Sequence, residues 1–134
     1  MATLDLNTDE VVEDVKPIVL VISDARGDTA YSVVVAAAAQ FDVDAMDIAR
    51  LPDARNVQDV NTFIDAQEEG RPMAVFHTFT DERLRRDVRH ALVKRGIPSI
   101  DLLGPAVTVL STLTGVEPSN KVGALRDRLA HVAE

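Results

Sequence analysis

Apolar and polar residues alternate between two periods from residue 17 onward. Short apolar runs, typical of strands covered on both faces, are separated by longer segments in which apolar residues recur every three or four positions, as in amphipathic helices. The pattern predicts strands at 18–22, 43–48, 73–77 and 99–102. It predicts helices at 28–40, from Asn56 to a stop at Gly70 and Pro72, at 81–94, from Gly104 to Gly115, and in a short C-terminal segment with Leu125, Leu129 and Val132.

Strands that alternate with helices favour an α/β fold with a parallel sheet and right-handed crossovers. We therefore predict a three-layer sandwich around a four-stranded parallel sheet of order 2-1-3-4, flavodoxin-like or Rossmann-like. The second strand is the most polar, which places it nearer an edge. Ligands of such sheets bind at the carboxyl ends of the strands. The turns at 23–29, 49–56, 77–81 and 101–105 are therefore the places to look for a site.

The N-terminal residues follow neither period. Residues 1–16 carry five acidic side chains and no regular apolar spacing, so we interpret them as a flexible acidic tail. The 118 residues that follow are enough for one hydrophobic core. The predicted organisation is an acidic flexible tail at 1–16 and a single α/β domain at 17–134.

Composition narrows the classes of function. The formal net charge is −8 and the pI is near 4.8, which argues against partners such as nucleic acid and anionic membranes. The absence of cysteine excludes disulfides, thiolate chemistry and cysteine-ligated zinc. No apolar run approaches the ~20 residues of a membrane span, and the acidic N-terminal residues do not resemble a signal peptide. We expect a cytoplasmic protein.

The turn after the first predicted strand is the strongest candidate site. Gly27 lets the backbone approach a ligand, Arg26 can clamp a phosphate or carboxylate, and Ser23 and Thr29 supply hydroxyl groups. The N–H groups of the helix that follows point at such a ligand. The structural alternative is an ordinary strand-to-helix turn, with Asp28 and Thr29 capping the helix.

Two carboxylates complicate an anion site in this turn. Asp24 and Asp28 repel an anion unless Arg26 or a cation offsets their charge. The two carboxylates also leave open the alternative that a phosphate binds here together with Mg²⁺. No two histidines have metal-ligand spacing, so no protein metal site is predicted.

The later strands end in further polar residues. His77, beside Thr78, could act as an acid or base, although such a histidine is more often a satisfied, partly buried side chain. Asp101 could bind a ligand or the neighbouring turn, or cap the helix that begins at Gly104. Ser23, His77 and Asp101 could converge above the sheet, but the G-x-S-x-G elbow of a hydrolase is missing. No catalytic residue is therefore assigned.

Two nucleotide motifs are also missing. The chain has neither G-x-x-x-x-G-K-[ST], the P-loop, nor G-x-G-x-x-G, the dinucleotide fingerprint. We predict no cofactor on this chain, with phosphate or a nucleotide as an external ligand. The predicted ligand-binding residues are Ser23, Asp24, Arg26, Gly27, Asp28, Thr29, Thr78, Asp101 and Gly104.

Four segments together resemble one family. They read I-V-L-V-I-S-D-A-R-G-D-T-A, A-A-A-A-Q-F, F-H-T-F-T-D-E-R-L-R and G-I-P-S-I-D-L-L-G-P. The combination is similar to the N-terminal portion of the pyruvate, phosphate dikinase or phosphoenolpyruvate synthase regulatory proteins, also called kinase/pyrophosphorylases. The likeness covers residues 18–123. The family's first turn usually reads S-D-S-T-G-E-T-A, and here Ala25, Arg26 and Asp28 depart from it.

The resemblance implies a regulator that phosphorylates a dikinase on threonine with ADP and removes the phosphate with inorganic phosphate. In that family the P-loop lies in a C-terminal half that has no counterpart in these 134 residues. The chain is therefore expected to be either a piece of a longer protein or a natural single-domain relative. We expect a regulatory or anion-sensing domain without kinase activity of its own. The alternatives are a fragment of the active bifunctional enzyme, or a module that docks a dikinase or self-associates as a homodimer.

Overall fold

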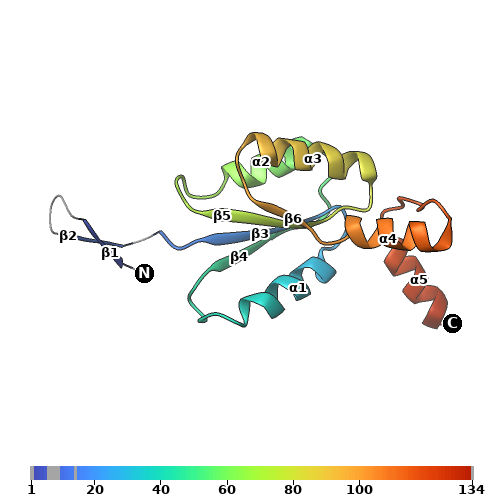
Figure 1. Cartoon of the computed structure of the whole chain (residues 1–134), viewed down its shortest axis with the longest axis horizontal. Helices are drawn as coiled ribbons and strands as arrows, with labels where there is room; N and C mark the ends of the chain where they lie inside the picture. The colour runs from blue at the N-terminus through green and yellow to red at the C-terminus, as the bar shows by residue number, and fades with distance from the viewer. Residues whose placement is uncertain (1, 6–9, 14, 134) are drawn as a thin grey trace.

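A computed structural model describes residues 2–5, 10–13 and 15–133 of the chain (Figure 1). The strands are β1 (Ala2–Asp5), β2 (Glu10–Glu13), β3 (Ile18–Ser23), β4 (Asp47–Leu51), β5 (Met73–Thr78) and β6 (Ser99–Asp101). The helices are α1 (Asp28–Ala38), α2 (Val57–Asp65), α3 (Glu82–Lys94), α4 (Gly104–Thr114) and α5 (Ala124–Ala133).

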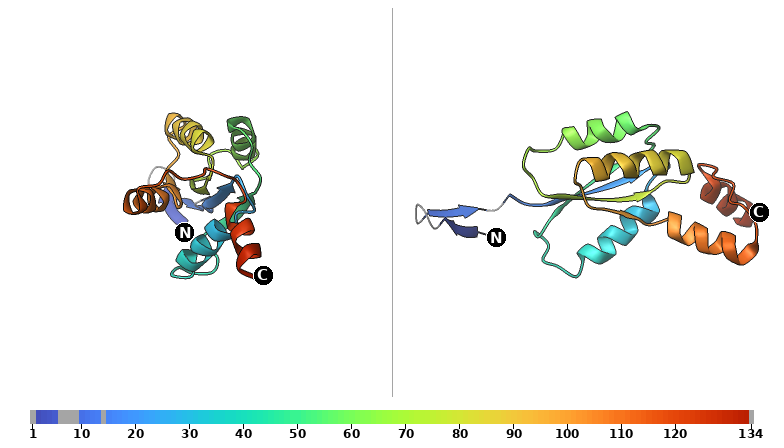
Figure 2. Two further views of the ribbon diagram at one scale, coloured as in Figure 1. Left: turned by 90° about the vertical axis from the view of Figure 1, so that its right-hand side faces the viewer. Right: turned by 45° about the horizontal axis from the view of Figure 1, so that its top comes forward.

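The main sheet has four parallel strands in the order β4-β3-β5-β6. Counted from β3, this is the predicted order 2-1-3-4, and the predicted α/β sandwich is confirmed. Helices α2 and α3 cover one face of the sheet and α1 covers the other (Figures 1 and 2). The polar second strand, β4, lies at an edge as predicted. The carboxyl ends of β3 and β5 lie side by side at the centre, because Ile22 pairs with His77 and Ser23 with Thr78.

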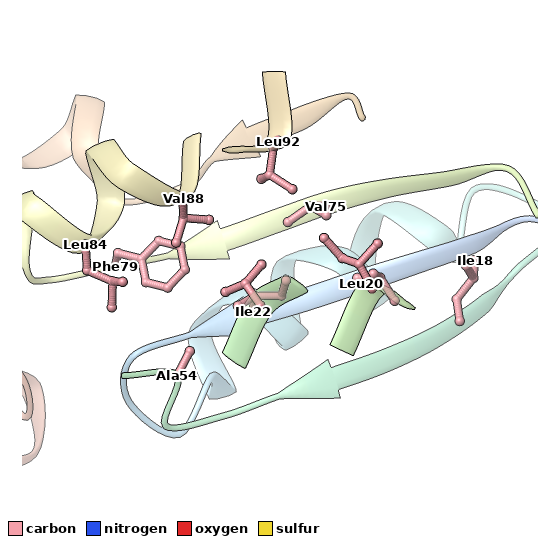
Figure 3. Close-up of a cluster of buried hydrophobic side chains, with 11 residues drawn as sticks. Ile18, Leu20, Ile22, Ala54, Val75, Phe79, Leu84, Val88 and Leu92 are labelled. Atoms are coloured by element: carbon pink, nitrogen blue, oxygen red, sulfur yellow. The ribbon is translucent and has the colours of Figure 1, made fainter. Parts of the chain in front are cut away.

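The larger part of the core lies between the sheet and the α2–α3 layer (Figure 3). Leu20 and Ile22 of β3 meet Val75 of β5 and Val88 and Leu92 of α3, all fully buried. Burying one such side chain contributes about 1.5–3 kcal/mol, so this cluster fixes the position of α3 against the strand ends. A smaller cluster under α1 contains Val21, Ala30 and Val34.

Local signals set the helix boundaries. The side chain of Asn56 accepts a hydrogen bond from the backbone N–H of Asp59 at 2.8 Å, which starts α2 as predicted. Asp81 accepts from the N–H groups of Arg83 and Leu84 and starts α3 in the same way. Gly115, in the left-handed conformation, ends α4.

Two predicted boundaries are wrong. The second strand begins at Asp47 rather than residue 43, since Val43 is 95% exposed and precedes the sheet. Helix α2 ends at Asp65, five residues before Gly70, because the chain turns away after Ala66.

The N-terminal segment contains structure that the pattern did not predict. Strands β1 and β2 form an antiparallel pair, separate from the main sheet, in which Ala2 is opposite Glu13 (Figure 1). The flexibility predicted for residues 1–16 is not tested, and residues 1, 6–9 and 14 lie outside the described residues. The division of the chain at residue 17 stays a prediction.

Candidate functional site

A cleft lies at the carboxyl ends of β3 and β5, where the topology predicts a ligand site. Its volume is about 590 Å³, and its walls come from the β3–α1 turn, the β5–α3 turn and the two C-terminal helices. Helices α4 and α5 extend beyond the strand ends and form its far side (Figure 1). Six of the predicted residues line it: Ser23, Arg26, Gly27, Asp28, Thr29 and Thr78.

Gly27 gives the first turn its shape. Its φ of +81° is a conformation that glycine adopts without a Cβ penalty, and it is the N-cap residue of α1. No side chain caps this helix, so the predicted capping by Asp28 and Thr29 is wrong. The N–H groups of the first turn of α1 are therefore left without a side-chain acceptor beside the cleft.

Two arginines offset the charge of Asp28. Its carboxylate is 3.4 Å from Nε of Arg26 and 2.9 Å from Nη2 of Arg50. Arg50 also donates to the carbonyl of Arg26 at 3.2 Å and lies 4.3 Å from the ring centroid of Tyr31. The repulsion that Asp28 would exert on an anion is thus reduced within the turn itself.

Asp24 does not line the cleft. Its carboxylate is buried and accepts hydrogen bonds from the backbone N–H groups of Thr80 and Asp81, at 3.0 and 2.9 Å, and from the Thr80 hydroxyl at 3.2 Å. These bonds join the end of β3 to the turn between β5 and α3. The geometry gives Asp24 a structural role, and its contact with a ligand stays a prediction.

Ser23 and Thr78 face each other at the base of the cleft. The Ser23 hydroxyl donates to the carbonyl of Thr78 at 3.1 Å and accepts from the N–H of Ala25 at 3.0 Å. The Ser23 hydroxyl is therefore already bonded to the backbone. Neither ring nitrogen of His77 has a hydrogen-bond partner in the described structure, so Ser23, His77 and Asp101 are not joined in a hydrogen-bonded triad.

His77 differs from its predicted state. The side chain is fully buried instead of partly buried, its ring packs 5.1 Å from that of Phe79, and it is not satisfied by any hydrogen bond. Burial lowers the pKa of His77 below its usual value; nearby Asp101 acts in the opposite direction, and Arg85 and Arg89 lower the pKa further. The neutral ring is the form that the fold holds.

His77 makes the fold sensitive to acid. Because its pKa is lower in the folded than in the unfolded chain, the contribution of His77 to stability is complete above about pH 6.5. As the pH falls below that value the unfolded chain takes up the proton first, and stability decreases by up to about 1.4 kcal/mol per pH unit until the folded pKa is reached. We expect His77→Leu to remove this component, measured by urea unfolding between pH 7.5 and 5. The control His90→Gln should retain it; equal pH dependence in His77→Leu and the wild type would contradict the prediction.

Asp101 and Gly104 lie beside the cleft but do not line it. The Asp101 carboxylate accepts from the N–H groups of Leu103 and Gly104, at 3.0 and 2.7 Å, and lies 3.6 Å from Nε of Arg85. Of the interpretations left open for Asp101, capping of α4 is confirmed. A Cβ on the buried Gly104 would lie 2.1 Å from this carboxylate, so Gly104 provides the space that the cap needs.

Several residues of the cleft were not singled out from the sequence. The polar ones are Asp53, Arg85, Asn120 and Arg126, and the larger apolar ones are Leu103, Val107, Leu125 and Leu129. Asp53 falls in the turn at 49–56, which the topology marks as a place to look. The residues of α4 and α5 carry no such signal, because their position depends on how the chain folds back after Gly115.

The described residues include no group of three histidine or acidic side chains placed to hold a metal ion. None of the described helices has the length and hydrophobicity that a membrane span requires. The polar side chains that line the cleft carry guanidinium, hydroxyl, amide and carboxylate groups.

Comparison with known proteins supports the resemblance found in the sequence. The sequence model of the kinase/pyrophosphorylase family matches residues 19–133. The chain belongs to this family. The match includes the whole of the main sheet after its first residue and every element that forms the cleft.

Family relatives carry a common name. Proteins named as pyruvate, phosphate dikinase regulatory proteins in Lactiplantibacillus plantarum, Bdellovibrio bacteriovorus and Clostridium beijerinckii are 36%, 32% and 30% identical to this chain. The matches cover 80%, 81% and 81% of the chain but only 39%, 38% and 40% of the relatives. This kinase/pyrophosphorylase relative thus spans about two fifths of the length of the curated proteins it matches.

Proposed function

We propose that the cleft binds a small anion, such as phosphate or the phosphate group of a nucleotide, and that the domain acts as a ligand-sensing part of a dikinase regulator. The observation that carries the proposal is the uncapped N-terminus of α1, which opens on the cleft at Gly27 beside Arg26. Helix N–H groups and a guanidinium group together form the common recognition pattern for phosphate.

The charges around the cleft also support an anionic ligand. Arg26, Arg85 and Arg126 line it, against Asp28 and Asp53. Asp28 is paired with Arg50 in addition to Arg26, so its negative charge is offset within the turn.

The regulated protein that we propose is a pyruvate, phosphate dikinase or a phosphoenolpyruvate synthase. Support comes from the names of the relatives, which describe them as dikinase regulatory proteins. Transfer of phosphate to threonine, which the family resemblance implies, needs a nucleotide cradle, and this chain has no P-loop motif. We therefore propose sensing and binding for this chain, without phosphoryl transfer of its own.

We expect Arg26→Ala to weaken phosphate binding about tenfold, because one charge-assisted contact worth ~1.5 kcal/mol is lost. Titration calorimetry with sodium phosphate, and separately with pyrophosphate and ADP, measures the effect. The matched control is Arg55→Ala, which removes an exposed arginine outside the cleft. Unchanged affinity in Arg26→Ala would exclude Arg26 as the clamp; no binding of any of the three anions by the wild type would overturn the proposed function.

The second candidate is half of an active kinase/pyrophosphorylase. The partial coverage of the relatives favours it, since they have room for a further domain that this chain does not match. Incubating the purified chain with ADP and a dikinase tests whether it transfers phosphate without that further domain. Threonine phosphorylation by the chain alone would overturn the proposal that it only senses a ligand.

A further inference from the structure

Positive charge is concentrated in one short segment of this acidic chain. Six of its 14 lysines and arginines lie between residues 83 and 95, where Asp87 is the only acidic residue. Six cations against one carboxylate give this segment a charge of +5. Because the whole chain carries −8, the remainder carries −13.

Three of these cations and one histidine form a line on α3. Arg83, Arg86, His90 and Lys94, which we call the α3 stripe, are spaced by three or four residues, and all four are exposed. This spacing places them on one face of the helix. The last three line a groove of about 640 Å³ between α2 and α3, with Val57 and Ala91 as its apolar part.

The stripe is not paired within the chain. Among the described residues, no acidic group lies within salt-bridge distance of Arg83, Arg86 or Lys94, whereas the neighbouring Arg95 pairs with Asp65 at 2.6 Å. The chain has 22 acidic residues and 14 lysines and arginines, so it contains more than enough carboxylates to pair with the stripe. The groups are left available on the surface.

This arrangement costs helix stability. Arg83 and Arg86 lie in the first turns of α3, where the helix dipole favours acidic groups. A face that only needs to be solvated would be more stable with mixed charges, so we assign the stripe to binding.

We propose that the α3 stripe docks an acidic helical segment of a partner protein. The groove lies between two helices, and the stripe runs from Arg83, just outside the groove, to Lys94, a separation of 11 residues or about 16 Å at 1.5 Å per residue, which fits roughly three turns of a third helix. Glutamates at matching spacing would meet the stripe, while apolar side chains would meet Val57 and Ala91. A nucleic acid fits less well, because the rest of the chain repels it and no aromatic side chain lines the groove.

This surface is separate from the ligand cleft. It lies between α2 and α3, whereas the cleft lies at the carboxyl ends of β3 and β5, and the two share no lining residue. The docking proposal therefore does not depend on the proposed anion site, and each can fail alone.

The test uses a fluorescein-labelled synthetic helical peptide of about 18 residues, with glutamates at i, i+3, i+7 and i+11 beside a row of leucines. We expect fluorescence anisotropy to show binding that weakens with salt, and the double variant Arg86→Glu with Lys94→Glu to weaken it at least tenfold. The matched control, Arg55→Glu with Arg128→Glu, makes the same charge change at exposed arginines outside the groove and should bind within about twofold of the wild type.

Three results would overturn the proposal. They are equal weakening in the two double variants, equal binding of a peptide in which glutamine replaces glutamate, and tighter binding of a single-stranded oligonucleotide than of the acidic peptide. Far-UV circular dichroism checks that each variant is folded. If the glutamate variant is not, Arg86→Gln with Lys94→Gln replaces it and is expected to weaken binding at least fivefold.

Discussion

Asp24→Ala is expected to lower the free energy of unfolding by about 3 kcal/mol. The substitution removes the acceptor for the N–H groups of Thr80 and Asp81 and for the Thr80 hydroxyl, in a place where the Asp24 carboxylate is only 7% exposed. A hydrogen bond to a charged group contributes about 1.5–3 kcal/mol, and a buried donor left without an acceptor costs about 1–3 kcal/mol. Urea unfolding followed by circular dichroism measures the loss.

Two further variants separate the carboxylate from the site. Asp24→Asn keeps the size but turns an N–H₂ group toward backbone donors, so an intermediate loss is expected. Asp44→Ala removes an exposed carboxylate and should leave stability within about 0.5 kcal/mol of the wild type. If Asp24→Ala unfolds at the same urea concentration as Asp44→Ala, the connection between β3 and the β5–α3 turn contributes nothing to stability.

The role of Asp24 could not be predicted from the sequence. In the chain it stands three residues before Gly27, so it was grouped with the anion turn. Its partners are backbone amides at Thr80 and Asp81, which are 56 and 57 residues away. Backbone groups carry no sequence signal, so a side chain that binds them is easily assigned to a ligand instead.

The sequence predicted the fold more completely than the site. Alternation of apolar runs with helical spacing predicted the strand order β4-β3-β5-β6, because each parallel crossover leaves few arrangements. Elements with a continuous buried face, β3, β5 and α3, were placed within a residue or two. Within the main domain the larger errors fall where burial is weak, at the polar edge strand β4 and the end of α2.

The sequence predicted the base of the cleft but not its far wall. The turn residues at its base follow from the rule that ligands bind at the carboxyl ends of parallel strands, and Gly27 has the positive φ that such a turn needs. Its far wall comes from α4 and α5, whose Leu125 and Leu129 are each 59% exposed despite lining it. The spacing of these leucines predicts a helix but not the surface that it faces, so its place in the site is visible only in three dimensions.

Gly104→Ala is expected to cost about 2 kcal/mol, although alanine is normally the better helix residue by about 1 kcal/mol. The new Cβ would lie 2.1 Å from Oδ2 of Asp101 and 2.9 Å from its Cγ, so the carboxylate has to move. Moving it breaks its hydrogen bonds with the N–H groups of Leu103 and Gly104, worth about 3 kcal/mol together. The loss exceeds the gain in helix propensity, and thermal and urea unfolding should both show it.

A double-mutant cycle identifies the cause. Asp101→Ala alone should cost a similar amount, because it removes the same cap. In the Asp101→Ala background, Gly104→Ala has no carboxylate to displace, so it should be neutral or stabilise by up to about 1 kcal/mol, which gives a coupling of about 3 kcal/mol. An equal cost of Gly104→Ala in both backgrounds would mean that the glycine is needed for something other than the cap. A loss of phosphate affinity in Gly104→Ala that exceeds the loss in Asp101→Ala would then return Gly104 to the list of ligand contacts.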